Sequence, residues 1–266
     1  MSGSNSRLRR FYSVAAVHTL MLKSLRQQRR DPLSLGLTLG TSPFFVAVYR
    51  LLYGGDSPVG IDEFVPSLLI FAVIMLIFNT AMAVAREREE KTLARLRRSP
   101  MGDGHYLMAT GLVQALVGGV SVGLTFLAAL ALGFEPRGSA LAGFGITLVA
   151  GMACIGLGLA VASLAASVHR AFLIASASMF LLLLFSGVIF PLPTVEVVNV
   201  MGLAVGPLDL LPTVHAVRAL QDVLLRGSAV TDLTSEVAAM VTLSLLYFSL
   251  GWSIFAGGTA MTSKGV

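Results

Sequence analysis

Charged residues are scarce in this chain of 266 residues, and cysteine is almost absent. Asp, Glu, Lys and Arg make up 12% of the sequence, where a soluble domain carries about 25%. Hydrophobic residues reach 55%, which is more apolar surface than one soluble core of this length can bury. The same composition excludes intrinsic disorder, and the single Cys154 excludes a disulfide scaffold.

Charge is missing altogether from six long stretches, and a helix needs about 20 apolar residues to cross a bilayer. The first stretch is the shortest, but Arg50 near its end can extend its charge to the interface. We therefore predict an all-α polytopic membrane protein with six transmembrane helices. The expected spans cover about residues 33–53, 64–85, 106–134, 139–168, 171–190 and 237–259.

The basic residues are distributed unequally between the two sides of the membrane. With the amino terminus inside, 15 of the 19 Lys and Arg residues fall on the inner side, and only Arg50, Arg137, Arg218 and Arg226 lie outside. The positive-inside rule therefore predicts that both termini are cytoplasmic. Residues 7–30 are expected to form an amphipathic helix in the inner interface, with an apolar stripe that contains Leu8, Phe11, Ala15, Leu22 and Leu25. A merely basic tail is the alternative for this segment.

The stretch from Ala171 to Leu208 holds 38 residues with Glu196 as its one charge, which is too long for a single crossing, while Thr194–Val205 is too short to cross by itself. Pro191 and Pro193 are expected to end the fifth helix near Phe190. We expect Thr194–Val205 to dip back as a half-helix on the outer side, and a further outer helix over about Pro212–Leu225. Residues 191–226 would then form an outer re-entrant pair. If Thr194–Val205 crossed instead, the carboxyl terminus would lie outside.

Several kinds of membrane protein are disfavoured by what the spans lack. Their cores hold no ionisable residue, so an ion-coupled carrier has no acid to titrate, and no selectivity-filter loop is visible. The chain also has no G-x-x-x-x-G-K-[ST] stretch to bind nucleotide phosphates. Gly119–Gly123 matches the G-x-S-x-G pattern of hydrolases, but no His lies at that depth. Close helix packing explains these glycines better, as it does Gly36 and Gly40. No metal or nucleic-acid site is indicated.

The loop between the second and third spans, about residues 86–104, mixes both signs of charge. Glu87, Glu89 and Glu90 alternate with basic residues, and Leu93 and Leu96 add a small apolar stripe. A loop that only faced anionic lipid headgroups would gain nothing from three glutamates. A mixed-charge helix with two leucines suits docking to another protein better.

Two segments resemble ABC-2-type permeases, the membrane subunits of bacterial ABC exporters related to daunorubicin-exporter permeases. The loop resembles their E-R-E-x-G-T-L-x-x-L-x-x-[ST]-P segment, with Lys91 in place of the usual glycine. The matching residues are Glu87, Arg88, Glu89, Thr92, Leu93, Leu96, Ser99 and Pro100. The second segment resembles the S-G-x-x-x-P … P … R pattern at the end of the fifth span. It contains Ser186, Gly187, Phe190 and Pro191, followed by Pro207, Pro212 and Arg218.

The resemblance implies a half-transporter in the bacterial inner membrane. Two permease subunits, identical or sister chains, would pair, with a separate ATP-binding subunit under each. The chain itself would bind no cofactor and would not be an enzyme, since ATP and Mg would lie on the partner. The loop would be the coupling helix, and the segment from Ser186 to Arg218 the outer gate.

Small polar residues on the second and fifth spans are candidates for the translocation face, namely Asn79, Thr80, Ser176 and Ser178. An apolar path without fixed charge favours amphiphilic drugs, lipids or glycolipids as the exported substrate. Two other classes stay open. One is a non-transporting membrane scaffold or immunity-type protein, and the other is a membrane enzyme.

Overall fold

The computed structural model describes residues 2–53, 61–90, 103–189, 198–200 and 203–262. Six of its helices are long and apolar enough to cross a membrane. They are α2 (Pro32–Tyr53), α3 (Ile61–Glu89), α5 (Asp103–Ala131), α6 (Ala140–Leu164), α7 (Val168–Phe185) and α9 (Thr234–Thr262). The predicted fold class of an all-α polytopic membrane protein with six such helices is confirmed.

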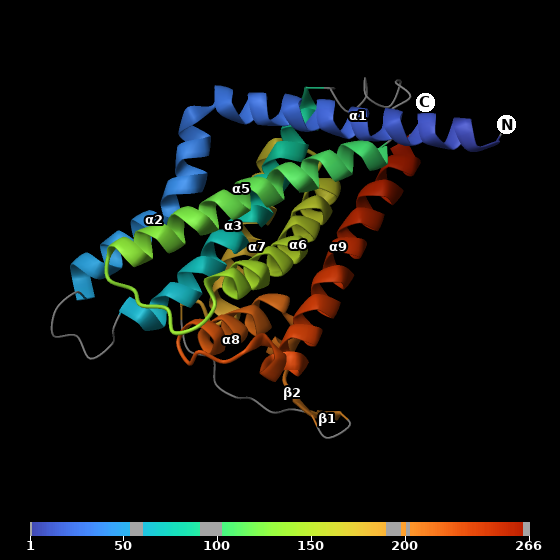
Figure 1. Ribbon diagram of the computed structural model, residues 1–266. Coiled ribbons are helices and arrows are strands. Elements are labelled where there is room, and N and C mark those ends of the chain that lie inside the picture. Colours follow the sequence, from blue (N-terminus) through green and yellow to red (C-terminus); the bar gives the residue numbers. More distant parts are fainter. Residues whose placement is uncertain (1, 54–60, 91–102, 190–197, 201–202, 263–266) are drawn as a thin grey trace.

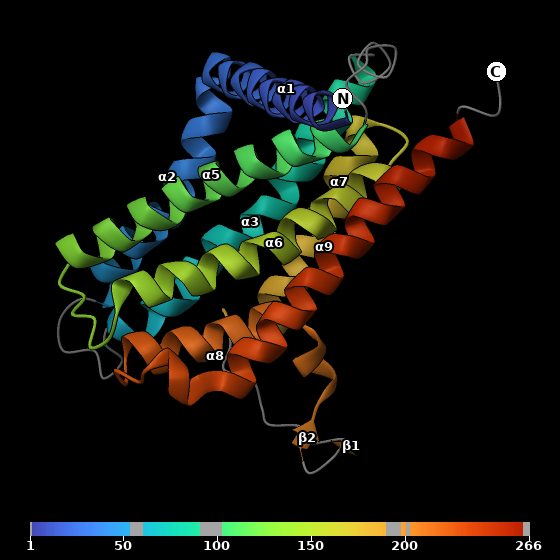
Figure 2. The same cartoon turned by 45° about the vertical axis from the view of Figure 1, so that its right-hand side comes forward.

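The six helices form one bundle around α3 and α6, which are its most buried members. Helix α1 (Ser2–Arg30) lies across one end of this bundle, and α8 (Pro212–Leu224) lies across the other (Figures 1 and 2). We call these the α1 end and the α8 end. Because successive long helices alternate in direction, α9 finishes at the α1 end, on the same side as α1 (Figure 1).

A sharp corner separates α1 from α2. Pro32 opens α2, where its missing N–H costs no hydrogen bond, and the Asp31 carboxylate accepts a hydrogen bond from the Ser34 backbone N–H at 3.1 Å. Helix α1 then packs against α5, with Val17 and Leu20 buried, while Leu22 of the predicted apolar stripe is exposed on its far side.

The closest helix contact joins α6 to α9. A Cβ atom on Gly251 would lie 1.9 Å from the carbonyl oxygen of Gly156, and one on Gly156 would lie 2.5 Å from the Cα of Phe248. The two backbones can touch only because neither residue has a side chain. By contrast, an added Cβ on Gly36, Gly40 or Gly123 has nothing within 4 Å in the single chain, and one on Gly119 meets only side chains, so no such backbone contact is present at these glycines within the described residues.

The α8 end is closed by short elements that come between α7 and α9. The helix expected over about Pro212–Leu225 is present as α8, preceded by the 3-10 helix η1 (Pro207–Leu210) and followed by η2 (Val230–Leu233). The half-helix expected over Thr194–Val205 is wrong in its described part. There β1 (Val198–Val200) pairs antiparallel with β2 (Leu203–Val205), which lie beyond the bundle in Figure 2. Four of the six paired residues are Val or Leu, and β-branched Val favours strands over helix.

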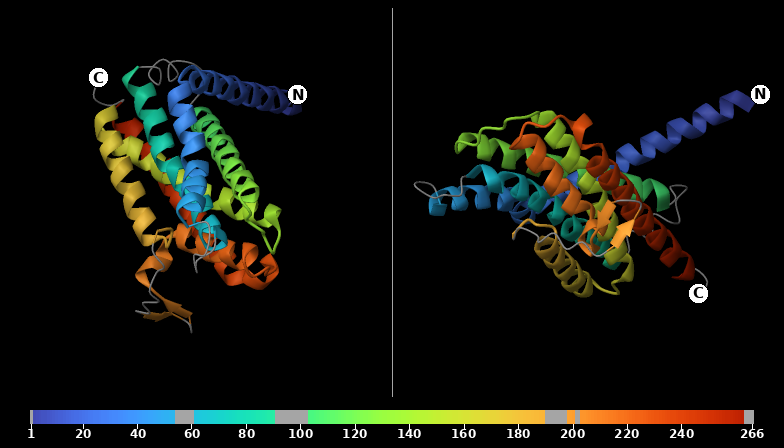
Figure 3. Two further views of the ribbon diagram at one scale, coloured as in Figure 1. Left: turned by 90° about the vertical axis from the view of Figure 1, so that its left-hand side faces the viewer. Right: turned by 90° about the horizontal axis from the view of Figure 1, so that it is seen from below.

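Three helices form one face of the bundle. Helices α2, α3 and α7 lie side by side, with α3 between the other two (Figure 3). Aromatic side chains join them: Phe45 of α2 contacts Phe71 of α3, and Phe78 of α3 contacts Phe172 of α7, both edge to face. Most of α2 and α7 nevertheless stays unburied in the single chain.

Candidate functional site

Four consecutive residues at the end of α3 each bind a different part of the α1 end. Arg86 lies 3.3 Å from the Asp31 carboxylate at the corner between α1 and α2. Glu87 accepts a hydrogen bond from Lys23 of α1 at 3.2 Å, and its carboxylate is almost fully buried. The stem of the predicted coupling loop is therefore attached to α1 and to Asp31, the residue that joins α1 to α2.

The next two residues reach the turn between α6 and α7. Arg88 donates a hydrogen bond to the carbonyl oxygen of Ala165, the residue that caps the end of α6. The Glu89 carboxylate accepts one from the backbone N–H of Val168 at 2.7 Å, at the start of α7. A carboxylate is favourable there because a helix amino terminus carries partial positive charge and free N–H groups. We call Arg86, Glu87, Arg88 and Glu89 the α3 hub.

The other predicted coupling residues are not part of this hub. Glu90 follows it and is exposed. Thr92, Leu93, Leu96, Ser99 and Pro100 lie outside the described residues, so their role as a docking surface stays a prediction. Sequence reasoning had treated Glu87 as part of that surface, whereas its carboxylate is turned inward to Lys23.

A cavity of about 120 Å³ lies next to the α3 hub, between α1, α2, α3 and α5. Asn79 lines it, and the Asn79 side-chain oxygen accepts a hydrogen bond from Thr38 of α2. The other predicted translocation residues lie elsewhere. Thr80 is fully buried at the contact between α3 and Gly158 of α6, and Ser176 and Ser178 are half-buried on α7.

The Ser-Gly pair at the end of α7 closes that helix and binds it to α8. The Ser186 hydroxyl forms a hydrogen bond with the Thr213 hydroxyl in the first turn of α8. Gly187 follows with a φ of +76°, a conformation that favours glycine at the end of a helix. The pair thus fixes the angle between α7 and α8, while Phe190 and Pro191 lie outside the described residues.

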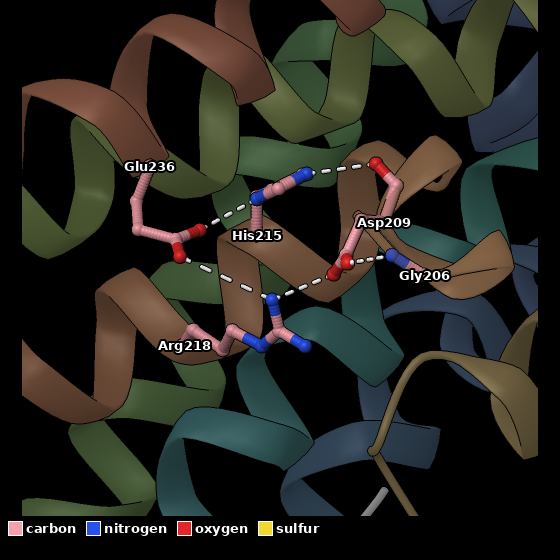
Figure 4. Close-up of polar contacts among 5 residues, drawn as sticks. All are labelled: Gly206, Asp209, His215, Arg218 and Glu236. Atoms are coloured by element: carbon pink, nitrogen blue, oxygen red, sulfur yellow. Dashed lines mark hydrogen bonds and ion pairs between the residues drawn. The ribbon is translucent and has the colours of Figure 1, made fainter. Parts of the chain in front are cut away.

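A polar network at the α8 end contains the predicted Arg218 and three residues that the sequence analysis did not single out. Arg218 binds the Asp209 carboxylate at 2.7 Å and lies 4.0 Å from Glu236 of α9. The other Asp209 oxygen accepts the Gly206 backbone N–H, next to Pro207 at the start of η1. His215 binds the Glu236 carboxylate through Nδ1 and the Asp209 carbonyl oxygen through Nε2 (Figure 4). The network therefore joins η1, α8 and the first turn of α9.

One signal in the sequence could have located this network. Asp209, His215 and Arg218 are the ionisable residues of the segment 206–218, and His215 and Arg218 are three apart, on one face of a helix. Their partner Glu236 comes from α9, which no local pattern indicates.

The comparison with known families agrees with this geometry. Residues 15–225, well over half of the chain, match the family described as ABC-2 type transporter. The chain belongs to this family. No individual curated protein matches it at a significant level. The ABC-2 match begins in α1 and ends at α8, so it includes the α3 hub and most of the network around Arg218.

Family membership places this ABC-2 protein among the multi-pass membrane components of ABC transporters. Such a membrane component in general works with a separate ABC ATP-binding partner, which hydrolyses the ATP. The resemblance stated from the loop and from the Ser186-Gly187 segment is confirmed at the level of the family.

The network of the ABC-2 chain favours the protonated form of His215. Both ring nitrogens face acceptors, a carboxylate and a carbonyl oxygen, so each must carry a proton to donate. Burial alone would lower the pKa of His215, but the hydrogen bonds to Glu236 and to the Asp209 carbonyl raise it above its ordinary value of 6.5. Burial would raise the pKa of Asp209, but the Gly206 N–H and Arg218 lower it.

This arrangement predicts a stability that falls in alkaline solution. A raised histidine pKa stabilises the fold fully below the unfolded value of 6.5, and the stabilisation is lost as the pH rises through the folded pKa. We expect the Tm of the purified protein to drop as the pH rises through that pKa, and His215→Gln to remove most of this slope of Tm against pH. His169→Gln, at an exposed histidine of α7, is the control. A slope unchanged in His215→Gln would contradict the assignment.

Proposed function

We propose that this chain is the permease subunit of an ATP-driven exporter, which moves an amphiphilic drug, lipid or glycolipid outward across the bacterial inner membrane. The observation that carries the proposal is the α3 hub. A force applied to the loop after Glu89 would reach four places at once, because residues 86–89 are bonded to α1, to the residue before α2, to the residue that caps α6 and to the start of α7. A permease that is moved by a conformational change of an ATPase requires such a connection to several helices.

The α1 end is the cytoplasmic side in this proposal, since the basic residues Lys23, Arg26, Arg29 and Arg30 of α1 and Arg86 and Arg88 at the end of α3 lie there. Two copies of an ATP-binding subunit, which hold ATP and Mg, would dock on residues 86–104. Helix α1 would lie in the inner interface, with Leu22 on its exposed side toward lipid. The Ser186–Arg218 segment at the α8 end would form the outer gate.

The docking assignment can be tested by assembly with the ATP-binding subunit. We expect Leu93→Asp together with Leu96→Asp to lower copurification of that subunit about tenfold, since apolar anchors carry much of the binding energy of an interface. Leu210→Asp is the matched control, because Leu210 is as apolar and is exposed at the opposite end. Normal assembly of the double variant would rule out the loop as the docking surface. If the wild-type chain assembled with the ATP-binding subunit but showed no ATP-dependent transport, a non-transporting scaffold would be favoured.

A second permease subunit, identical or sister, fits against α2 in this proposal. The inner face of α2 carries Thr38, Ser42 and the fully buried Val46, which contact α3 and α5. Its opposite face carries Gly36 and Gly40, a small-xxx-small pair with open space beside it. Such a pair lets another membrane helix approach closely.

We expect a photo-crosslinking amino acid at Leu37 to capture this second subunit in native membranes. Leu37 lies beside the two glycines and is 61% exposed in the single chain. The same amino acid at Leu246, an exposed residue of α9, should label lipid instead. Mass spectrometry of the product distinguishes an identical chain from a sister chain. Equal protein crosslinking from both positions would argue against α2 as the subunit interface.

A further inference from the structure

The cavity between α1, α2, α3 and α5 has no assigned occupant, yet it is lined by polar side chains with unused hydrogen-bonding atoms. The amide nitrogen of Asn79 and the amide oxygen of Gln114 are buried without a partner, and so are one oxygen of Gln28 and one of Glu87. Gln114 and Glu87 are 2% and 6% exposed. Buried polar atoms without a partner cost stability, so a site that keeps several is suited to a ligand or water that supplies them.

The size and access of the cavity suit a small polar group. A volume of about 120 Å³ holds several water molecules, or one compact headgroup. Ser24 and Gln27 are half-buried and Ser34 is exposed, so the cavity is open near the α1–α2 corner. Its deeper wall is apolar, with Val113 and Val117 of α5, and can hold the first carbons of a chain.

Each carboxylate at the cavity already has a cationic partner, although Lys23 itself does not line the cavity. Asp31 is paired with Arg86, and Glu87 with Lys23. An anionic headgroup would face the Glu87 carboxylate. An ammonium group could donate to the free oxygens of Gln28, Glu87 and Gln114, but it offers no acceptor to the amide nitrogen of Asn79. A hydroxyl group both donates and accepts, so it satisfies the free amide atoms whichever way the Asn79 and Gln114 amides are oriented.

We propose that this cavity binds a neutral, hydroxyl-rich group, as found in the headgroup of a glycolipid or in a free sugar. Asn79 and Gln114 would bind the hydroxyls, with Gln28 and Glu87 nearer the α1 end. The site lies within one subunit, and binding there requires neither ATP nor a second permease. It therefore goes beyond the proposed exporter function and can fail while that function stands.

The test uses the full chain in phosphatidylcholine nanodiscs and an alkyl glucoside whose alkyl chain carries a diazirine. We expect photolabelling of the cavity-facing parts of α2, α3 and α5, competed by unlabelled alkyl glucoside. Labelling should fall about tenfold in Gln114→Leu, which loses the buried acceptor. Gln221→Leu makes the same change on α8, away from the cavity, and should label normally. Competition by glucose alone would identify a free sugar as the ligand, and its absence a headgroup in the membrane.

Two further readouts guard against misfolding and against non-specific labelling. The alkyl glucoside should raise the Tm of the wild-type chain but not that of Gln114→Leu, and Asn79→Leu serves as a second variant. Labelling spread over lipid-facing helices and unchanged in both variants would overturn the proposal, and so would equal competition by an alkyl ammonium compound. If the wild-type permease still stimulated the ATPase activity of the ATP-binding subunit in either of those cases, the exporter assignment would stand although the cavity proposal had failed.

Discussion

Glu89→Lys is expected to uncouple ATP hydrolysis from transport while the ATP-binding subunit still assembles. The Glu89 carboxylate accepts the Val168 N–H at the start of α7, so lysine would leave that N–H without its acceptor and place a cation at the positive end of a helix. Transport per ATP hydrolysed should fall about tenfold, within the range of typical coupling free energies. Reconstituted vesicles with the ATP-binding subunit give both rates.

Two neighbouring variants separate this coupling role from docking. Glu89→Gln keeps an acceptor oxygen and should retain most of the transport. Glu90→Lys changes the same charge one residue later, at an exposed side chain, and should weaken assembly rather than the ratio of transport to hydrolysis. If Glu89→Lys and Glu90→Lys had the same effect on assembly, the contact to Val168 would not be the path of coupling.

Gly251→Val is expected to have the largest effect on the fold. A Cβ at this position would lie 1.9 Å from the carbonyl oxygen of Gly156, so α6 and α9 would have to separate. Inserting carbon atoms into a close-packed contact costs about 1–3 kcal/mol or more, which corresponds to a Tm lower by about 10 °C in a chain of this size. Fluorescence-detected size exclusion after heating measures the loss directly.

The matched control for this substitution lies on the same helix. Gly257 has nothing within 4 Å of an added Cβ and is exposed, so Gly257→Val should change the Tm by about 2 °C or less. Gly156→Val, on the opposing helix, should lower the Tm as Gly251→Val does. The double variant should lower the Tm little more than either single variant, since one valine already forces the two helices apart. Equal loss in Gly251→Val and Gly257→Val would show that glycine itself, and not the helix contact, matters.

The sequence predicted the residues of the site better than the partners that these residues bind in the fold. The E-R-E segment and the Ser186-Gly187 pair were recognised from their order along the chain. Their partners were not, because Lys23 is 64 residues from Glu87, and Val168 is 79 residues from Glu89. In the same way, a local pattern could have identified His215 and Arg218, which lie three residues apart. Their partner Glu236 could not be found in this way, because it comes from α9.

The number and order of the membrane helices follow from the sequence alone, since the hydropathy of a stretch of about 20 residues is a local property that a bilayer selects directly. Only the tertiary structure decided how each helix is rotated. Helices such as α3 and α6 are apolar on every side, so no periodic pattern shows which face packs inward. That rotation turns Asn79 to the cavity and Thr80 to α6, and it brings Gly156 rather than Gly36 into contact with another helix of the chain.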